Sequence, residues 1–452
     1  MTKARLILAL PALLLLTAVV AASCGGGDGS DKPCEAPCTI TIWHSMPSLA
    51  EGVIERMADE FNASQSQYKV ELIFQGSYAE SLNKLIASIG SGDVPAAIQL
   101  ADVSTQIMVD SQEVTPVQDF VDAEDFDLSD FEPKAIDYYT LDGKLYAMPF
   151  NLSGPLLYYD RQAFEDAGLD PDQPPRTLEE LRAASEALVA RPNAPANAKA
   201  LSIEVSAWFF EEMLAKSGAL YVNNDNGRDG RATEAMFDGT EGKEIFQWWD
   251  EMVADGLAYN APDTTDAMLK LASGETSMAI ASTAALRGAI AALAIFGRDP
   301  SQYDAAAMPG PEGEGGGIAL GGAAFWVLER PSDDVQRGAW EFLKFASGTE
   351  QQARWHADTG YFPSRISSLD EPVAVQTREE FPQFEVALDQ LHDSPDTTAT
   401  AGALVGPFSE VRDVLSQALE QVLAGAKDPD SALEDAADQA TGIIEEYNRT
   451  AP

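Results

Sequence analysis

Strand patterns and helix patterns alternate along residues 39–102, and this alternation constrains the fold more than any other feature of the chain. The expected strands cover 39–43, 68–74 and 96–100, and the expected helices carry apolar side chains at helical spacing within 53–61 and 82–89. Units of this size predict a parallel or mixed α/β sheet. Ligands bind beyond the carboxyl ends of the strands in such sheets, so we expect His44, Tyr78 and Asp102 on one rim.

Residues 148–160 form an extended stretch rich in proline and glycine. Pro149 and Pro155 each fix φ and bias the preceding residue toward extended geometry. A chain of 452 residues is also too long for one ordinary core, and two lobes of about 150–200 residues are the natural expectation. We therefore interpret this stretch as the first strand joining two lobes, with Ser153 facing the space between them.

Two later segments are candidates for further crossings between the lobes. Residues 318–327 are a strand of small residues whose glycines allow another surface to approach the backbone, and 359–363 follow an expected helix. The remaining expected helices include 208–214, 245–252, 408–423 and 433–447, with a break at Pro429, and one that opens with a capping box at Thr177 and Glu180. Residues 225–230 superficially resemble a calcium loop. Met236 occupies the position of the bidentate glutamate, so we predict a turn.

The N-terminus has the pattern of a signal peptide. Lys3 and Arg5 precede the apolar run 6–20, and small residues follow it up to Cys24. A cysteine in this position resembles the lipobox of bacterial lipoproteins, although Ala21 stands where that motif more often has leucine. We expect residues 1–23 to be removed and 24–38 to be a lipidated tether. The alternative is a soluble secreted protein with an incidental cysteine.

The other two cysteines, Cys34 and Cys38, favour a small local disulfide in an oxidising compartment. The chain has no Cys-x-x-Cys and only three histidines, so metal and redox roles are not expected. Its formal charge of −44 excludes nucleic acid as a partner, because neutralising phosphates needs clustered Lys and Arg. The acidic residues are scattered, which is typical of a solvated surface and fits a saline habitat.

Several short segments together resemble the extracellular solute-binding proteins of ABC importers, and most closely their glycerol-3-phosphate-binding members. The markers are Trp43-His44-Ser45-Met46, Gln75-Gly76-Ser77-Tyr78, 150–159, 167–171, 274–278, Gly321-Gly322-Ala323 and Thr359-Gly360-Tyr361-Phe362-Pro363. The resemblance covers nearly the whole chain after the leader. It implies a two-lobe, periplasmic-binding-protein-like (type II) α/β fold with a ligand cleft between the lobes. The lobe segments expected from it are 39–150 and 323–358 for lobe 1, and 151–322 and 359–452 for lobe 2.

The resemblance also implies a set of ligand-binding residues. They fall on Tyr78, Asp102, Ser153, Trp208, Ser282, Gly322, Tyr361 and Arg412. Asp102 stands where the closest relatives often have glutamate, and Leu152 and Gly154 replace small hydroxyl residues beside Ser153. These differences bear on the choice of ligand more than on the class of protein.

The residue types in this set suit a phosphate ester of glycerol. Hydroxyls, backbone N–H groups and one guanidinium are the donors that phosphate needs, and Trp208 offers a flat face for a glycerol backbone, a sugar ring or a choline head group. We therefore expect a lipid-anchored receptor for glycerol-3-phosphate or a glycerophosphodiester such as glycerophosphocholine. The alternative is a receptor for a mono- or oligosaccharide.

Structural roles compete with these assignments. Trp208 lies in an aromatic helix and could simply pack in the core, and Arg412 could form a salt bridge with Asp413 or Glu420. No nucleophile elbow, metal cluster or phosphate-binding glycine loop indicates an enzyme. The expected protein is a monomer without a cofactor, anchored to the outer face of the cytoplasmic membrane, and its expected partner is an ABC permease.

Overall fold

The computed structural model describes residues 34–311, 313 and 315–451. The expected signal peptide (1–23), the expected lipidation site Cys24 and most of the expected tether lie outside these residues. Cys34 and Cys38 form a disulfide, the pairing that their spacing favoured. Within the described part of the chain, no helix combines the length and apolar character needed to cross a membrane.

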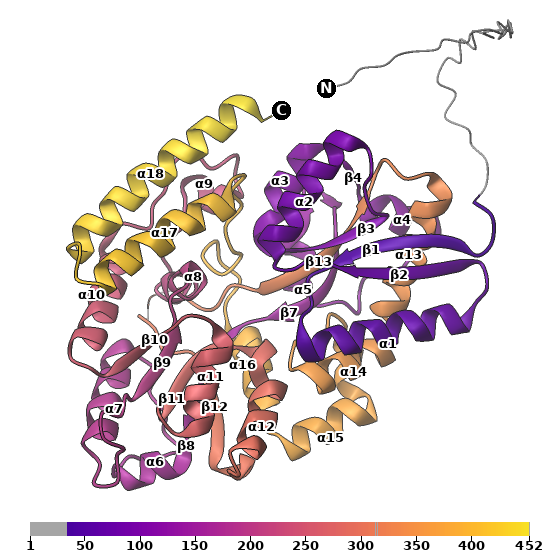
Figure 1. Ribbon diagram of the computed structural model, residues 1–452. Helices are drawn as coiled ribbons and strands as arrows, with labels where there is room; N and C mark the ends of the chain where they lie inside the picture. The colour runs from indigo at the N-terminus through magenta and orange to yellow at the C-terminus, as the bar shows by residue number, and fades with distance from the viewer. Residues whose placement is uncertain (1–33, 312, 314, 452) are drawn as a thin grey trace, which may run out of the picture. The chain divides into compact units, whose positions relative to one another are not determined.

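Six strands form a mixed first sheet, in the order β2-β1-β3-β13-β4, with β7 also paired to β13 (Figure 1). The strands are β1 (Cys38–His44), β2 (Tyr68–Phe74), β3 (Ala97–Ala101), β4 (Val114–Thr115), β7 (Met148–Ser153) and β13 (Gly321–Leu328). β1 is parallel to β2 and β3, whereas β13 is antiparallel to β3, β4 and β7. The first sheet is the mixed α/β sheet that the alternating pattern predicts.

The second sheet has the order β10-β9-β11-β8-β12. Its strands are β8 (Pro155–Asp160), β9 (Leu201–Glu204), β10 (Ala258–Ala261), β11 (Met278–Ser282) and β12 (Tyr303–Ala307). Strands β9, β10 and β11 are parallel, and β8 runs antiparallel to β11 and β12. A separate hairpin pairs β5 (Thr140–Leu141) with β6 (Lys144–Leu145) through a turn in which Asp142 and Gly143 have positive φ.

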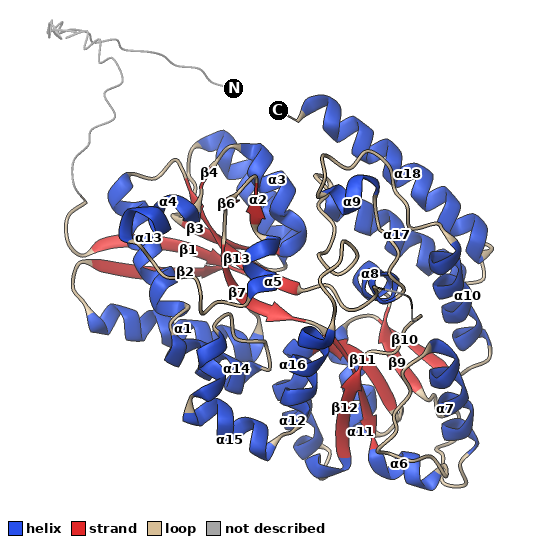
Figure 2. Cartoon of the chain, turned by 180° about the vertical axis from the view of Figure 1, so that it is seen from behind, coloured by secondary structure: helices blue, strands red, loops and turns tan. Residues whose placement is uncertain are grey.

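Helices cover both sheets, as Figures 1 and 2 show from opposite sides. Those with buried side chains in the hydrophobic core of the first sheet are α1 (Ser48–Ser64), α2 (Tyr78–Ser91), α3 (Thr105–Ser111), α4 (Val117–Glu124), α5 (Pro133–Tyr138), α13 (Asp333–Ala346) and α14 (Thr349–Thr359). The others are α6 (Arg161–Asp166), α7 (Leu178–Ala190), α8 (Ala207–Lys216), α9 (Asn223–Gly227), α10 (Thr240–Ala254), α11 (Thr264–Ser273), α12 (Leu286–Ile295), α15 (Pro372–Glu380), α16 (Gln383–Asp393), α17 (Phe408–Leu423) and α18 (Pro429–Thr450). Short 3₁₀ turns η1 (Asp102–Ser104) and η2 (Thr283–Ala285) follow β3 and β11.

Three segments of chain connect the two sheets. Residues 148–160, expected to be one extended crossing, are two strands that meet at Gly154, with β7 in the first sheet and β8 in the second. The chain returns through β13, and 359–363 bring a third segment alongside, where the Phe362 N–H donates to the Leu152 carbonyl over 2.8 Å. The change of sheet therefore falls at Gly154, slightly after the expected lobe boundary between residues 150 and 151.

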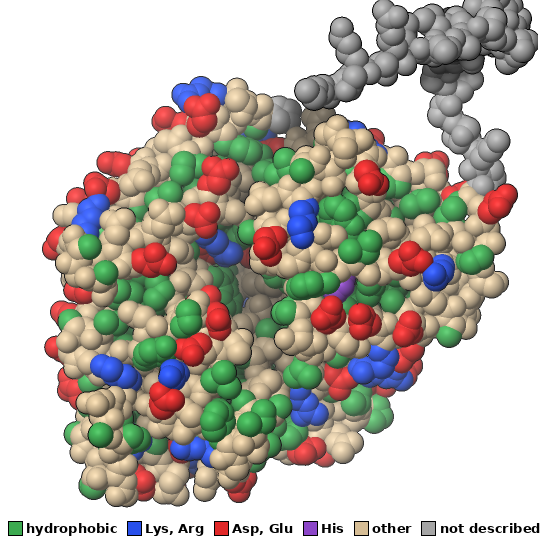
Figure 3. All heavy atoms as spheres, viewed as in Figure 1, with side chains coloured by type: hydrophobic (Ala, Val, Ile, Leu, Met, Phe, Trp, Pro, Cys, Tyr) green, Lys and Arg blue, Asp and Glu red, His purple; other side chains and the backbone are tan. Residues whose placement is uncertain are grey.

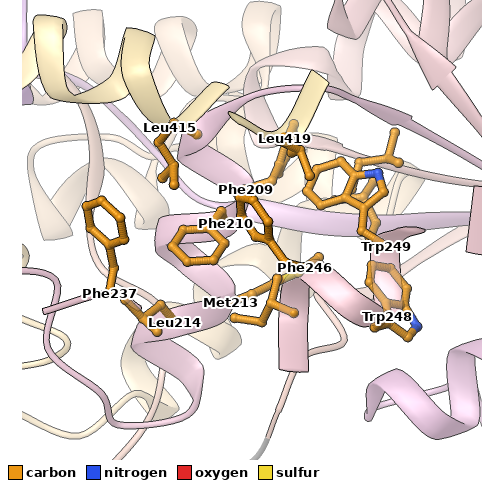
Figure 4. Close-up of a cluster of buried hydrophobic side chains, with 14 of the residues drawn as sticks. Phe209, Phe210, Met213, Leu214, Phe237, Phe246, Trp248, Trp249, Leu415 and Leu419 are labelled. Carbon is orange, nitrogen blue, oxygen red and sulfur yellow. The ribbon is translucent and has the colours of Figure 1, made fainter. Parts of the chain in front are cut away.

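One face of helix α8 packs in the core of the second lobe, and Trp208 lies outside that face. Phe209, Phe210 and Met213 are fully buried against aromatic residues of α10 and aliphatic residues of α17 (Figure 4). Trp208 is only partly buried and packs at the edge of this cluster. The core role considered for Trp208 therefore belongs to its helical neighbours, whereas Trp208 is only partly buried and packs against the core from one side.

Three local expectations differ from the structure in detail. Ile86, assigned to the apolar face of α2, has 51% of its surface exposed. Pro429, expected to be a break between two helices, is itself the first residue of α18, a position that proline favours. At 225–230 a turn is present, but it belongs to α9, where Asn224, Asp225 and Asn226 are all left-handed.

Replacing Thr177 with alanine is expected to lower the free energy of unfolding by about 1 kcal/mol, because an N-cap hydroxyl satisfies a backbone donor that helix geometry leaves unpaired. Thr177 Oγ1 accepts from the Glu180 N–H over 3.1 Å, and the Glu180 carboxylate completes the capping box of α7. Urea unfolding measures the change. Thr240→Ala is the matched control, since Thr240 is exposed at the start of α10 without a capping bond; an equal loss in both variants would contradict the prediction.

Candidate ligand-binding cleft

A cavity of about 670 Å³ lies between the two sheets. The first lobe, the second lobe and the three connecting segments all contribute to its wall, and the space-filling view shows a hollow at this position between the two parts of the molecule (Figure 3). All eight sequence-predicted residues line it: Tyr78, Asp102, Ser153, Trp208, Ser282, Gly322, Tyr361 and Arg412. The structure thus brings together side chains that are more than 300 residues apart in the sequence.

The first lobe contributes Tyr78 and Asp102 from chain segments that follow two strands. Tyr78 is the first residue of α2, whose start is held by a complete capping box between Ser77 and Glu80. Asp102 directly follows β3 and begins η1. Both positions agree with the expectation that the carboxyl ends of the strands form the rim.

His44, expected on the same rim, does not line the cavity. It is the last residue of β1 and only 2% exposed, with its ring tilted against Phe74 at a centroid distance of 5.7 Å. Burial lowers the pKa of His44 to about 4, so its ring is neutral at physiological pH. His44 is a core residue, and this part of the rim expectation is wrong.

The connecting segments contribute Ser153, Gly322 and Tyr361. Ser153 is buried at the end of β7, and its hydroxyl has no hydrogen-bond partner among the described residues. Gly322 has φ +124°, and an added Cβ would lie 2.1 Å from the Asn151 carbonyl oxygen, so the two crossings touch backbone to backbone here. The Tyr361 ring stacks on Trp355, with centroids 5.4 Å apart. The connecting segments therefore contribute a serine hydroxyl and a tyrosine ring to the cavity wall.

The second lobe contributes Trp208, Ser282 and Arg412. Trp208 lies beside the crossing at Gly321, where an added Cβ would be 3.3 Å from its Nε1. The Ser282 Oγ accepts from the Ala284 N–H over 3.2 Å, which leaves its O–H able to donate. Arg412 lies in α17 and lines the same cavity.

Arg412 forms an ion pair with Glu211, a residue that was not predicted from the sequence. Arg412 Nε and Nη2 donate to the two Glu211 oxygens at 2.8 and 2.5 Å, whereas Asp413 and Glu420, the partners considered from sequence, are not involved. Glu211 lies three residues after Trp208 in α8, and residues at this spacing share a helix face. That spacing is a signal from which Glu211 could have been found.

One nitrogen of the Arg412 guanidinium is not used in the pair with Glu211. Its Nη1 makes no hydrogen bond within the described residues, and the guanidinium lines the cavity. Burial alone would lower the pKa of Arg412, but the carboxylates of Glu211 and Asp102 raise it above its usual value. Arg412 therefore stays charged and is held in one orientation by a bidentate carboxylate, as required of an anion-binding group.

Two carboxyl groups in the cavity wall have raised pKa values. Burial raises the pKa of Asp102 to about 6, while the nearby Arg412 opposes the rise. Glu204, which the sequence reading missed, also has a raised pKa because of burial, and accepts from the Thr264 hydroxyl over 2.5 Å. Asn151, Leu49 and Leu269 are further wall residues that the sequence reading missed. They carried no signal of their own, since their place at the cavity depends on how the two lobes face each other.

The cavity wall contains both hydrogen-bond donors and an acceptor. Arg412, Ser153, Ser282 and Tyr361 can donate to an anionic oxygen, whereas Asp102 can accept from hydroxyls or face a cation. Among the described residues, no group of three or more histidine, cysteine or acidic side chains is placed to hold a metal ion. The cavity can therefore bind a small polar molecule that carries both an anionic group and hydroxyls.

Two α/β lobes joined by three crossings around such a cavity define a receptor that encloses a small solute. The family model described as bacterial extracellular solute-binding protein matches residues 56–383. The chain belongs to this family. Its members are solute-binding proteins, and membership places the chain outside the cytoplasm.

Sequence similarity to curated proteins extends over almost the whole chain. The sn-glycerol-3-phosphate-binding periplasmic protein UgpB of Yersinia pseudotuberculosis is 32% identical over 91% of this chain and 93% of its own length. The protein of the same description from Shigella flexneri is 30% identical over 92% and 94%. These relatives extend the similarity well beyond the segments matched by the family model.

Solved structures of low identity share the fold. UgpB from Mycobacterium tuberculosis, in complex with glycerophosphocholine, superposes with a TM-score of 0.76 at 23% identity and covers 91% of this chain and 99% of that one. The GacH receptor of Streptomyces glaucescens, solved unliganded and with acarbose, has a TM-score of 0.73 at 18% identity, covering 90% and 99%. The two-lobe α/β fold is therefore confirmed.

Proposed function

We propose that this protein is the solute receptor of an ABC importer and captures glycerol-3-phosphate or a glycerophosphodiester such as glycerophosphocholine. The observation that carries the proposal is the position of Arg412, fixed by Glu211 and facing the same cavity as Asp102 and Trp208. The curated relatives named for sn-glycerol-3-phosphate, with more than nine-tenths of each chain aligned, support the same ligand class.

The charge balance of the cavity favours a phosphodiester over a phosphomonoester. Arg412 is already paired with Glu211, and Asp102 and Glu204 add acidic groups to the wall. A phosphomonoester carries about −1.5 to −2 at neutral pH, so a diester with a single charge meets less repulsion. A quaternary ammonium group would in addition be attracted by the Trp208 ring and by the Asp102 carboxylate.

The decisive experiment is isothermal titration calorimetry of the purified chain with glycerophosphocholine, sn-glycerol-3-phosphate and maltose. We expect binding of glycerophosphocholine, weaker binding of sn-glycerol-3-phosphate and none of maltose. Maltose binding without a response to either phosphate would overturn the proposal and indicate a sugar receptor. Each binding isotherm is paired with a thermal shift, since a ligand that binds only the folded state raises the melting temperature.

Glycerophosphocholine affinity is expected to fall as the pH decreases from 7.5 to 5. The pKa of Asp102 is raised by burial to about 6, so this carboxyl is charged at pH 7.5 and mostly protonated at pH 5. A bound cation lowers that pKa, and each unit of lowering weakens low-pH binding by up to about tenfold. Calorimetry at both pH values measures the change. Asp102→Asn should remove most of the dependence, and an affinity that rises at low pH would contradict a cation beside Asp102.

The finer features of location and assembly belong to the same proposal. Cys24 would carry the lipid that anchors the chain to the outer face of the cytoplasmic membrane, and the monomeric receptor would deliver its ligand to the permease subunits. The ligand would favour a closed arrangement of the lobes to the extent that it binds the closed state more tightly than the open state. A Cys24→Ala variant released into the growth medium would support the anchor, and one retained on the membrane would exclude it.

A further inference from the structure

An ion pair outside the three connecting segments joins the two lobes. The Asp110 carboxylate, in α3, accepts from Arg231 Nη1 over 2.8 Å and from Arg231 Nη2 over 2.7 Å. The Tyr447 hydroxyl, near the end of α18, donates to the same carboxylate over 2.8 Å. We call Asp110, Arg231 and Tyr447 the latch. Its two helices, α3 and α18, lie next to each other at the top of Figure 1.

The latch connects the cores of the two lobes. Helix α3, which carries Asp110, packs into the core of the first lobe. Arg231 immediately precedes Ala232, a buried residue of the second core. Tyr447 lies one turn after Ile444, which is buried in the same core. The Asp110 side chain is only 7% exposed and is enclosed by donors, so this ion pair is costly to break.

The same pieces of structure carry two groups of the binding cavity. Asp102 begins η1, which runs directly into α3 and therefore leads to Asp110. Arg412 lies in α17, which packs both along α18 and against η1. Asp102 and Arg412 line one cavity from different lobes. A contact that holds α3 against α18 therefore also sets the distance between these two walls.

Another part of the cavity rim carries no such contact. Leu49, in α1 of the first lobe, is 54% exposed, and Leu269, in α11 of the second lobe, is 41% exposed. Both line the cavity, and among the described residues no hydrogen bond or ion pair joins 47–50 to 264–292. We call these two side chains the leucine rim. In Figure 1, α1 and α11 lie well below α3 and α18, so the lobes are fastened at the latch and unfastened at the leucine rim.

We propose that the latch residues are positioning residues that fix the separation between Asp102 and Arg412. This end of the cavity then selects ligands by the distance between their polar ends, and the lobes move apart at the leucine rim to admit them. A glycerophosphodiester with a cationic head group spans both walls, whereas sn-glycerol-3-phosphate is shorter and engages mainly the Arg412 wall. The identity of these ligands rests on the function proposed above. The latch itself follows from the contacts of the protein alone.

Asp110→Asn tests the latch with almost no change of shape. The amide keeps one acceptor oxygen, but its NH2 group faces a donor, so the ion pair is lost. We expect the dissociation constant for glycerophosphocholine to rise about tenfold, because a ligand that contacts both walls must now hold the lobes together itself. The dissociation constant for sn-glycerol-3-phosphate should rise by less than about threefold. Calorimetry with both ligands measures this ratio, and an equal loss for the two would indicate a general structural role and overturn the proposal.

Two further variants accompany Asp110→Asn. Glu113→Gln is the matched control, because Glu113 pairs with two nitrogens of Arg330 inside the first lobe. It should leave both affinities unchanged, and a tenfold loss of glycerophosphocholine affinity there would count against the latch. Tyr447→Phe removes one hydrogen bond of the latch and no charge, so it should weaken glycerophosphocholine binding in the same direction by a smaller factor.

Distances between spin labels test the latch without any ligand. The labels are attached through Ala87→Cys in α2 and Asp438→Cys in α18, which are exposed positions of the first and second lobes. We expect pulsed electron paramagnetic resonance to give a longer and broader distance distribution in the Asp110→Asn background than in the wild type or in Glu113→Gln. An unchanged distribution in Asp110→Asn would show that the latch does not hold the lobes. If the wild-type chain binds neither phosphate ligand, the proposed function fails, and these distances still decide whether the latch acts.

Discussion

Arg412→Ala is expected to weaken glycerophosphocholine binding by about 100-fold, because the phosphate would lose its charged donor in a cavity that otherwise carries acidic groups. Arg412 is the guanidinium that lines this cavity, and Glu211 holds it in place through two of its nitrogens. Calorimetry at pH 7.5 measures the loss. A change of less than about threefold would indicate a structural role for Arg412 and favour an uncharged ligand.

The same substitution should also destabilise the protein. Glu211 has a side chain only 12% exposed, and removing its partner leaves a buried carboxylate without a counter-charge. Such losses cost about 3–5 kcal/mol. Urea unfolding therefore has to accompany the binding assay, so that affinity is compared only between folded samples.

Two further variants complete the Arg412 experiment. Arg412→Lys keeps the charge but loses the planar arrangement of guanidinium donors. We therefore expect a glycerophosphocholine affinity between those of the wild type and Arg412→Ala, and a weaker ion pair with Glu211. Arg354→Ala is the matched control, since Arg354 forms ion pairs with Glu60 and Glu350 on the surface, away from the cavity. It should leave both affinity and stability near the wild-type values.

Gly322→Ala is expected to lower the free energy of unfolding by about 3 kcal/mol or more. Gly322 has φ +124°, which side chains rarely adopt, and its Cβ would lie 2.1 Å from the Asn151 carbonyl and 2.9 Å from the Leu152 Cα. The obstructing atoms are backbone, so they cannot move aside without separating β13 from β7. These strands form the crossings, so ligand affinity should fall together with stability.

Urea unfolding and calorimetry measure the two effects of Gly322→Ala. Gly442→Ala is the control, because Gly442 lies within α18 and an added Cβ would meet nothing within 4 Å. Alanine at position 442 should raise the free energy of unfolding by about 0.5–1 kcal/mol, because alanine has a better helix propensity than glycine. If the free energy of unfolding of Gly322→Ala lies within about 0.5 kcal/mol of the wild-type value, the close approach of the two crossings is not essential for stability.

The elements of the fold were largely predictable because their signals are local. Apolar spacing identified β2 and α17 to the residue, and the capping box at Thr177 placed the start of α7. Such patterns depend on which side chains share a face, and a short window of sequence contains that information. Ile86 shows the limit: it follows the helical spacing of its neighbours, but nothing packs over that end of the face.

The complete candidate site was predictable only through resemblance to a family, although strand ends indicated Tyr78 and Asp102 and the extended stretch 148–160 indicated Ser153. Ser282 and Arg412 carry no individual signal of a binding site in the sequence, yet both line the same cavity. His44 had as good a position at a strand end as Asp102, but its side chain turns into the core. Which strand-end residue faces the cavity depends on the twist and packing of the sheet, and a single sequence does not encode these locally.

By itself the sequence determined an α/β chain of two lobes, an extended crossing at 148–160 and a set of residue types suited to a phosphate ester. The tertiary structure alone decided that this crossing is two strands divided at Gly154, and that Arg412 pairs with Glu211. It also decided the buried hydrogen bonds that link Ser45 through Gln99 and Asn151 to the Tyr78 hydroxyl. The physical reason is the same in each case: strand pairing, ion pairing and hydrogen-bond direction join residues far apart in the chain, and only the packed fold specifies which ones meet.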